Sequence, residues 1–458
     1  MIGLTAGLEV ARKALSSYQL ALTVYGNNIA NVDTPGYSRR TLLLSEGEGH
    51  KIRAGRIGLG VDAVTIRRMR DHFLDDAYRR QSTSLGMYES LEQSLAEVEM
   101  VFGEPGDSGL STVLNEFWDS WQELANQPES PTVRTLVKDK AQSLARVLHQ
   151  MDRSLVSQVQ ALDSEVEGHV NHVNGIASAI ADYNAKIVAS ESSGHEATDL
   201  RDQRDLLVDQ LSEIVDVSVF QRDDGSISVM MGSEALVERA DFVQLSVASV
   251  SRDGMAVKEV RLGEIRRAIT PTGGKLGGVL RSRDEIVPKY RDDLNEIARS
   301  LVESVNTSHR AGYAMDGTSG RDFFDPAGVT AETIDVSAII LGDVNLIAAS
   351  SDGSVGNGDG ALAIAGLRHA AITADGSTLD DYYASVVGTL GIESETAAIN
   401  REREELLVLE IENRRESVKG VSIDEEMTNM IAAQHAYEAA AKVISIVDEM
   451  MDTVLSML

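Results

Sequence analysis

The chain has 458 residues, of which 43% are hydrophobic and 25% charged, a composition suited to a soluble protein of about three domains with a sizeable core. Only 4% of the residues are aromatic and only seven are prolines, which favours long aliphatic helices. The net charge of −30 disfavours binding to nucleic acid or anionic lipid. The absence of cysteine excludes disulfides, thiolate metal sites and a cysteine nucleophile.

The sequence shows no sign of membrane insertion, of a cleaved signal peptide or of catalysis. We find no apolar run of the length that spans a bilayer, and no basic segment followed by an apolar one at the N-terminus. The HExxH, GxSxG and Walker motifs are absent, so no enzyme activity, catalytic residue, metal or cofactor is expected. If the protein leaves the cell, we expect export without cleavage.

Charge is distributed unevenly along the chain. Residues 1–70 contain ten Lys or Arg and five Asp or Glu, whereas the last 38 residues contain seven acids and one lysine. Opposite charges at the two ends favour pairing of the ends with each other or with neighbouring subunits. The alternative is a solvated surface whose asymmetry has no role.

An apolar stripe with a period of 3.5 residues marks a helix at each end of the chain, as in a coiled coil. The N-terminal stripe comprises Leu4, Leu8, Ala11, Leu15, Tyr18, Leu22, Tyr25 and Ile29. The C-terminal stripe comprises Met430, Ala433, Tyr437, Ala440, Ile444, Val447, Met451, Val454 and Leu458. Each helix could simply pack on a core, but core helices usually have a wider apolar face. We therefore predict that both stripes are assembly interfaces.

A sharp turn is expected after the N-terminal helix. Asparagines there tolerate a left-handed backbone, the residue before a proline prefers an extended one, and Pro followed by Gly fits a type II turn. Residues 37–44 and 61–66 then contain β-forming side chains. The predicted turn comprises Asn28, Asn31, Thr34, Pro35, Gly36 and Tyr37.

The pattern predicts a mainly α fold: an elongated, nested, multidomain chain with terminal coiled-coil helices, a long-helix bundle and a small inserted β-rich domain. A terminal coiled-coil domain would pair residues 1–65 with 420–458. A helical bundle would comprise residues 66–212, completed by 276–311 and 376–419. Alternating apolar residues predict a β-rich outer domain at 213–275. Residues 312–375 read as an irregular insertion rich in Gly and Asp, with short strands near 333–340.

Two groups of residues in the middle are open to a structural or a functional interpretation. Trp118 and Trp121 lie three apart in a predicted helix, and we interpret them as core anchors instead of a ligand site. Residues 199–207 form a dense run of Asp and Arg. We interpret this run as a solvated helix face with ion pairs at three- and four-residue spacing, with a binding site as the alternative.

The stretch from Asn27 to Tyr37 resembles the signature shared by bacterial flagellar rod, hook and hook-associated proteins. Residues 38–40, the run at 199–207 and the tail at 434–445 resemble the hook-associated protein 1 family in particular. The resemblance implies a structural protein that forms a ring joining hook to filament, outside the cell, after export by the flagellar type III apparatus. It also implies contacts with the hook protein, a second hook–filament junction protein and a cytoplasmic export chaperone that binds the C-terminal helix.

Two competing functions remain open at this point. Another axial flagellar protein, of the hook or distal rod, would share the turn signature but lack the Asp/Arg run. A secreted helical adhesin or binding module would require a ligand for residues 215–270 and no partner for the terminal stripes. Because an isolated helix is marginal in water, we also hypothesise that both terminal helices are mobile in the monomer and become ordered on assembly.

Overall fold

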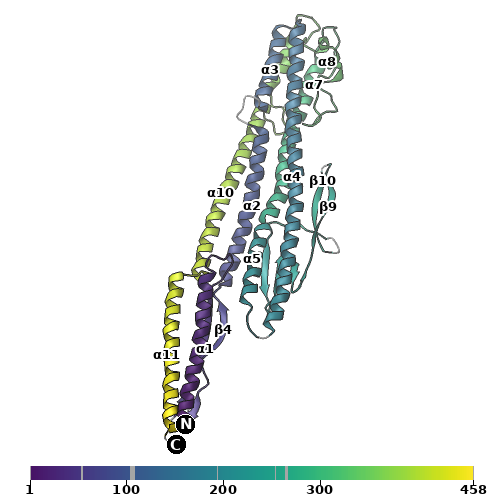
Figure 1. The fold of residues 1–458 in the computed structure, drawn as a ribbon. Helices are drawn as coiled ribbons and strands as arrows, with labels where there is room; N and C mark the ends of the chain where they lie inside the picture. The colour runs from purple at the N-terminus through teal and green to yellow at the C-terminus, as the bar shows by residue number, and fades with distance from the viewer. Residues whose placement is uncertain are drawn as a thin grey trace.

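The computed structural model describes residues 2–52, 55–103, 109–192, 194–252, 254–263 and 267–456, with the side chains of all except 2–4 and 50–57. The molecule is an elongated rod of long helices, and both chain ends lie together at one tip (Figure 1). The prediction of a mainly α fold with a small β-rich insertion is confirmed. No helix within the described ranges has the length and apolarity needed to cross a membrane.

Three layers form the terminal unit, by which we mean the elements that contain both chain ends. Helix α1 (Ile2–Ala30) lies beside the antiparallel helix α11 (Ile423–Ser456). Strands β1 (Arg40–Glu46) and β4 (Val61–Arg68) pair antiparallel against the other side of α1. Between them, β2 (His50–Ile52) pairs with β3 (Gly55–Ile57). Figure 1 shows α1 between α11 and this β1–β4 ribbon.

The body of the rod consists of long helices that pack along one another. The longest, α4 (Pro131–Glu191), begins where the Ser130 side chain accepts a hydrogen bond from the Val133 amide and a proline occupies the first turn. Its apolar stripe is buried along the whole bundle. The other body helices are α2 (His72–Phe102), α3 (Leu110–Asn126), α5 (Thr198–Ile214), α6 (Gly274–Arg281), the π-helical η1 (Ser282–Ile286), α7 (Val287–Ala311) and α10 (Leu379–Lys419).

A small β-rich insertion packs on α4. Its first sheet has the strand order β5-β6-β7-β8, and its second the order β11-β10-β9. Gly225, with a φ of 84°, supplies the left-handed residue of the turn that follows Asp223 and Asp224 between β5 and β6. The strands are β5 (Val217–Gln221), β6 (Ile227–Met231), β7 (Glu234–Glu238), β8 (Asp241–Phe242), β9 (Leu245–Arg252), β10 (Met255–Leu262) and β11 (Arg267–Ala268).

The tip farthest from the chain ends encloses an aromatic core. Trp118 and Trp121 are almost fully buried there beside Phe323 and Phe324, as core anchors should be. The strand expected near 333–340 is instead a single bridge from Phe324 to Val336 followed by a short helix. Asn295 and Asn306 satisfy the backbone there, so a ladder is not required. The short helices are α8 (Ala338–Gly342), η2 (Val344–Leu346), α9 (Asp359–Ala365) and η3 (Gly366–His369).

Candidate assembly interface

The predicted N-terminal stripe is only partly covered. Ala11 is buried, and the Leu4 side chain lies outside the described residues. The half-buried members are Leu8, Leu15, Tyr18, Leu22, Tyr25 and Ile29. The buried positions of α1 are shifted toward the β1–β4 ribbon because α1 is covered from two sides. Ser17, for example, is buried and donates a hydrogen bond to the Val61 carbonyl at 3.2 Å.

On α11 the covered surface is a single line of residues. Burial recurs at every seventh position, where α11 faces α1. Of the other predicted positions, Met430 and Ile444 are half-buried, and Leu458 lies outside the described residues. Tyr437, Met451 and Val454 are exposed. The line of buried residues comprises Glu426, Ala433, Ala440 and Val447. One partner helix therefore leaves apolar side chains uncovered on both flanks of α11.

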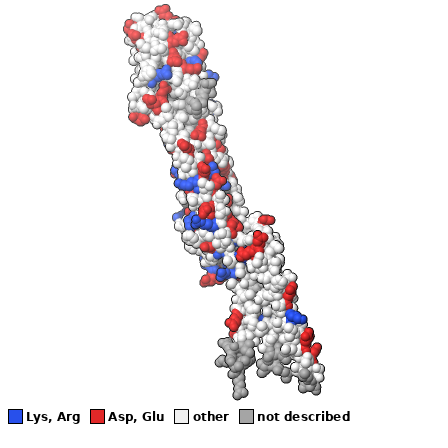
Figure 2. Space-filling model, turned by 90° about the vertical axis from the view of Figure 1, so that its left-hand side faces the viewer, with Lys and Arg blue, Asp and Glu red and all other residues white. Residues whose placement is uncertain are grey.

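Figure 2 views the molecule from the side on which α11 lies, and the surface over the terminal unit is mostly uncharged, with scattered acidic groups and little basic surface. Burying apolar surface is favourable at roughly 25 cal/mol per Å², and contiguous exposed apolar surface on a soluble protein marks an interaction site. The uncovered flanks of α11 are thus a candidate assembly interface.

A buried asparagine ties the ends of the terminal unit together. The amide nitrogen of Asn28 donates to the Arg40 carbonyl (2.9 Å) and to the Glu426 carboxylate (2.7 Å). Its carbonyl oxygen accepts from the Tyr37 hydroxyl (2.8 Å) and from the Arg40 amide (3.0 Å). Arg39 pairs with the second oxygen of Glu426. Four elements therefore meet around the fully satisfied side chain of Asn28, in what we call the Asn28–Glu426 cluster.

The predicted turn lies directly beside this cluster. The Tyr37 amide donates to the Thr34 carbonyl at 3.1 Å, and Gly36 has a φ of 77°, as a type II turn after Pro35 requires. Asn31 caps the end of α1 through its side chain, which bonds the Asn27 carbonyl and accepts from the Thr34 hydroxyl. A side chain at position 36 would crowd Leu206 of α5, so the turn fits closely against the body.

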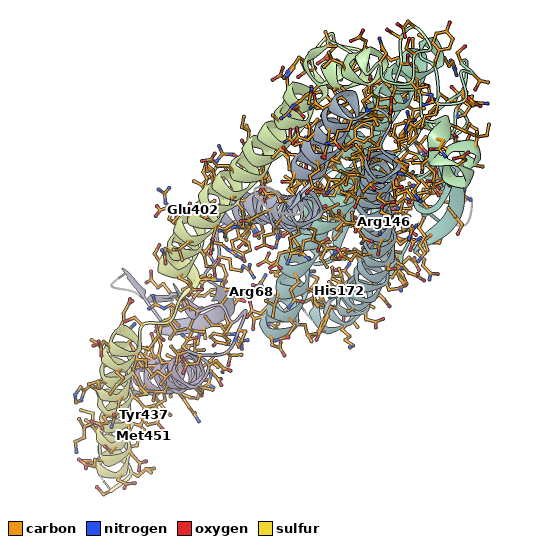
Figure 3. All side chains as sticks on the ribbon, turned by 90° about the horizontal axis from the view of Figure 1, so that it is seen from above. Arg68, Arg146, His172, Glu402, Tyr437 and Met451 are labelled. Carbon is orange, nitrogen blue, oxygen red and sulfur yellow. The ribbon has the colours of Figure 1, made fainter. Side chains whose placement is uncertain are left out.

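The Asp/Arg run of α5 is not a solvated helix face, contrary to the prediction. Asp202, Asp205 and Asp209 are buried, and their ion-pair partners come from distant parts of the chain. Arg68, at the end of β4, contacts Asp202 (3.0 Å) and Asp205 (2.9 Å). Figure 3 shows Arg68 where the terminal unit meets the body.

Helices α2 and α10 complete this ion-pair cluster. Arg70 contacts Asp75 (2.9 Å) and Asp205 (3.1 Å). Arg415, near the end of α10, contacts Asp75 (3.0 Å) and Asp209 (2.6 Å), and its guanidinium lies 4.1 Å from the centre of the Tyr78 ring. The cluster joins β4, α2, α5 and α10 where the terminal unit meets the body.

Burial and the neighbouring guanidinium groups shift the pKa values of the cluster's carboxylates in opposite directions. Burial alone would raise the pKa of Asp205, but the guanidinium groups of Arg70 and Arg68 outweigh it and hold that pKa well below its usual range. Burial would also raise the pKa of Asp75, but the guanidinium groups of Arg70 and Arg415 outweigh the effect of burial and lower that pKa. At Asp202 burial prevails over Arg68 and raises the pKa. These residues serve structure, and among the described residues no group of three or more His, Asp or Glu could hold a metal.

Comparison with known proteins assigns the terminal unit to a class. Residues 8–37 match the family described as the flagella basal body rod protein, and residues 417–457 match the flagellar basal body rod FlgEFG protein C-terminal family. These two segments are α1 with its turn, and α11. Both paired ends of the chain therefore resemble those of flagellar rod proteins, and they are joined to an elongated body. This arrangement is that of a flagellar axial protein.

The body specifies the family. Residues 95–324 match the flagellar hook-associated protein FlgK helical domain. The chain is 32% identical to flagellar hook-associated protein 1 of Bacillus subtilis, over 98% of this chain and 97% of the relative. The chain is 25% identical to the Escherichia coli protein of the same name, over 97% of this chain and 98% of the relative. The chain belongs to the flagellar hook-associated protein 1 family, a family of structural proteins of the flagellum.

A solved structure has the same fold. The flagellar hook junction protein FlgK from Burkholderia pseudomallei superposes with a TM-score of 0.68 at 16% identity, covering 76% of this chain and all of that one.

Sequence reasoning missed Glu426, Arg39 and Arg415 as structural residues. Glu426 lies on the buried line of α11, seven residues before Ala433. A charged residue at a position of the heptad that is otherwise apolar could have indicated a buried ion pair. Arg415 gave no such signal, because its two partners lie on α2 and α5.

Proposed function

We propose that this chain forms the junction between the flagellar hook and the filament by self-assembly through its terminal helices. One observation carries the proposal: α11 is covered by α1 along a single line, and apolar residues remain exposed on both flanks. Membership of the hook-associated protein 1 family supports the location. On this proposal residues 1–65 and 420–458 act together as the assembly unit, and the role is structural without catalysis.

The partners follow from where such a unit must sit. Copies of the chain would pack side by side in a ring, with the hook protein on one side and the second hook–filament junction protein on the other. Before export by the flagellar type III apparatus, without cleavage, the exposed flanks of α11 would be an aggregation hazard in the cytoplasm. A cytoplasmic export chaperone that covers Met430–Val454 would remove that hazard.

Deletion of the gene in its host tests the proposed function. Flagella are examined by electron microscopy, and flagellin is assayed in the medium. Complete hooks without filaments, together with flagellin released as monomer, are the expected result. Missing hooks would instead place the protein in the rod or hook, and normal filaments would contradict an axial role and direct attention to a ligand of the β-rich insertion.

A further inference from the structure

Helix α10 carries a row of exposed apolar side chains on its outer side, which we call the α10 stripe. Ile392, Ile399 and Leu406 follow one another at seven-residue spacing and are 66%, 57% and 60% exposed. Each comes two residues after a buried residue of α10, and two residues correspond to about 200° of rotation around a helix. The buried residues are Leu390, Ala397 and Glu404. The stripe therefore points away from the body.

The arrangement of the helices agrees with this placement. Glu404 bonds Gln81 of α2, on the inner side of α10. Figure 1 shows α10 at the outer edge of the body beside α2, and Figure 3 shows Glu402 on the side of α10 that faces away from the body. No described element of the same chain covers the stripe, because its three residues are more than half exposed.

The body offers few other surfaces that could match such a stripe in a second copy. Outside α10, α11 and the tip, the large apolar residues that the described body exposes lie singly, for example Phe73 on α2, Val188 on α4 and Phe220 on β5. Among the described residues of the body, α10 itself is thus the surface of matching length.

The α10 stripe is complementary to itself when a second copy runs antiparallel. With a two-fold axis at Ile399, residues equally far from Ile399 in opposite directions lie at the same level. Ile399 then meets Ile399 of the second copy. Ile392, seven residues before the axis, meets Leu406 of the second copy, seven residues after it. The apolar side chains of the stripe are therefore all matched with apolar side chains.

The charges beside the stripe also match in this arrangement. Glu395 and Arg403 lie four residues before and after Ile399, so each faces the other residue of the second copy. Glu395 is exposed and forms no ion pair with any described residue. Arg403 contacts Glu404 at 2.9 Å, yet its side chain remains 59% exposed. A parallel pair would instead bring like charges together, which disfavours it.

Two further exposed leucines find room in the same arrangement. Leu407 and Leu409 are 41% and 57% exposed. In the second copy they come level with Gly391 and with the turn that contains Gly388. A Cβ at either glycine would meet no atom within 4 Å, so the helix surface is open there to close approach. A groove of about 410 Å³ opens beside Ile392. Its apolar lining includes Tyr88, Leu91, Leu95 and Ile286.

We propose that two unassembled copies of the chain pair antiparallel through their α10 stripes, about a two-fold axis at Ile399. Such a contact uses the same patch on both copies and closes on itself. The two terminal units then point in opposite directions, so the pair must separate before its members can enter one ring. The contact spans ~20 residues of each helix, about 30 Å, and is therefore weak and reversible. The inference goes beyond the proposed function and does not depend on it.

A single engineered thiol tests the symmetry, because the native chain has no cysteine. For helix axes about 10 Å apart, Ile399→Cys brings the two Cα atoms to about 5 Å, within the range of a disulfide. The purified full-length variant is oxidised mildly at high protein concentration, and we expect a disulfide-linked dimer.

Glu402→Cys is the matched control, since Glu402 is exposed on the same side of α10, three residues from the axis. In the antiparallel pair its two thiols are separated by about 9 Å along the helices, too far for a disulfide. This variant should stay monomeric. Equal cross-linking of the two variants would indicate a parallel pair or random collision and would overturn the proposal.

A charge exchange gives a second readout without cysteines. Sedimentation of the full-length chain over a range of concentrations measures the dimer dissociation constant. Arg403→Glu should raise this constant about tenfold, and Glu395→Arg in the same chain should restore it. Both side chains are exposed, and circular dichroism checks that the variants fold. A double variant as defective as Arg403→Glu contradicts the pairing.

Two other results would also overturn the proposal. One is a wild-type chain that stays monomeric at every concentration. The other is an Ile399→Cys thiol that cross-links in isolated flagella to a different protein, which would assign the α10 stripe to that partner. Neither result affects the junction role, which the deletion strain tests separately.

Discussion

At the scale of residues, the terminal unit depends on the side chain of Asn28, which is buried and fully paired. Asn28 has two donors and one acceptor oxygen, and the structure satisfies all of them with partners from the turn, β1 and α11. An apolar residue at this position could not satisfy Glu426 and Arg40 together. Leaving buried polar groups without partners costs about 1–3 kcal/mol each, so this cluster fixes where α11 starts relative to α1.

Replacement of Asn28 therefore has a local and large expected effect. Asn28→Ala should destabilise the top of the α1–α11 pair by about 3 kcal/mol, since it leaves the Glu426 carboxylate and the Arg40 backbone groups unsatisfied. Hydrogen exchange of residues 422–430 measures the change. The control is Asn27→Ala, one residue away on the exposed side of α1. Equal exchange in the two variants would show that the cluster does not hold the pair.

His309 provides a pH-dependent element at the other tip. It is buried, its Nε2 accepts from the Ala348 amide and its Nδ1 donates to the Arg321 carbonyl, each at 2.8 Å. Burial lowers the pKa of His309 to about 4. Because this pKa is depressed, the unfolded chain binds the proton more readily between pH 6.5 and 4, and stability is lost as pH falls through that range.

The expected loss at His309 is about 3 kcal/mol of unfolding free energy between pH 6.5 and 4. Thermal unfolding of the body at pH 7 and pH 5 should show a clear decrease in the wild type. His309→Gln, which cannot take up the proton, should be less stable at pH 7 but nearly insensitive to this change of pH. An identical pH dependence in both proteins would assign the effect to other groups.

At the scale of elements, the ion-pair cluster is what joins the terminal unit to the body. Strand β4 enters it through Arg68, α2 through Asp75, α5 through Asp205 and α10 through Arg415. A buried pair is weak support for overall stability, yet removal of one partner leaves an uncompensated charge, at a cost of about 3–5 kcal/mol. The cluster therefore specifies the angle between unit and body.

Arg415→Met tests this role against a neighbour. We expect a loss of about 3–5 kcal/mol and looser attachment of the terminal unit, because Asp75 and Asp209 lose a partner. Arg414→Met is the matched control, since Arg414 is exposed and its one ion pair among the described residues is with Glu410 one helical turn away, a contact worth under about 1 kcal/mol. Chemical unfolding compares their stabilities, and small-angle scattering reports the attachment. Equal effects of the two variants would contradict the assignment.

The elements themselves were predictable because their signals are local. Ser130 and Pro131 begin α4, and Pro35 with Gly36 forms the expected turn. The cluster was not predictable, since Asp202, Asp205 and Asp209 have the same spacing whether a helix is solvated or buried. Their partner Arg68 is 134 residues from Asp202, and Arg415 is 206 residues from Asp209. The extra residue of β4, Val64, which lies between the partners of Leu43 and Leu44, likewise follows from strand pairing and not from local pattern.

At the scale of the whole molecule, the helices of the body bury most of their apolar residues, whereas the terminal unit leaves much of α11 exposed to solvent. The core helices of the body are buried from several sides, whereas α11 is buried only at every seventh position. Segments with few buried apolar contacts open most easily. Hydrogen exchange of the monomer should therefore show strong protection in α4 and weak protection in residues 430–456. Strong protection of the latter would contradict the hypothesis that the terminal helices become ordered on assembly.

The most direct test of assembly through the terminal helices replaces one half-buried residue of the predicted apolar stripe on each helix. Ile444→Asp and, on α1, Leu15→Asp place a charge on the predicted interface, while Ser445→Asp places it on the exposed polar side of the same helix. Each variant is expressed as the only copy, and flagella are examined by electron microscopy. We predict complete hooks without filaments for the first two variants, with the body still folded by circular dichroism, and normal filaments for Ser445→Asp. Normal filaments in Ile444→Asp and Leu15→Asp would contradict assembly through the terminal helices.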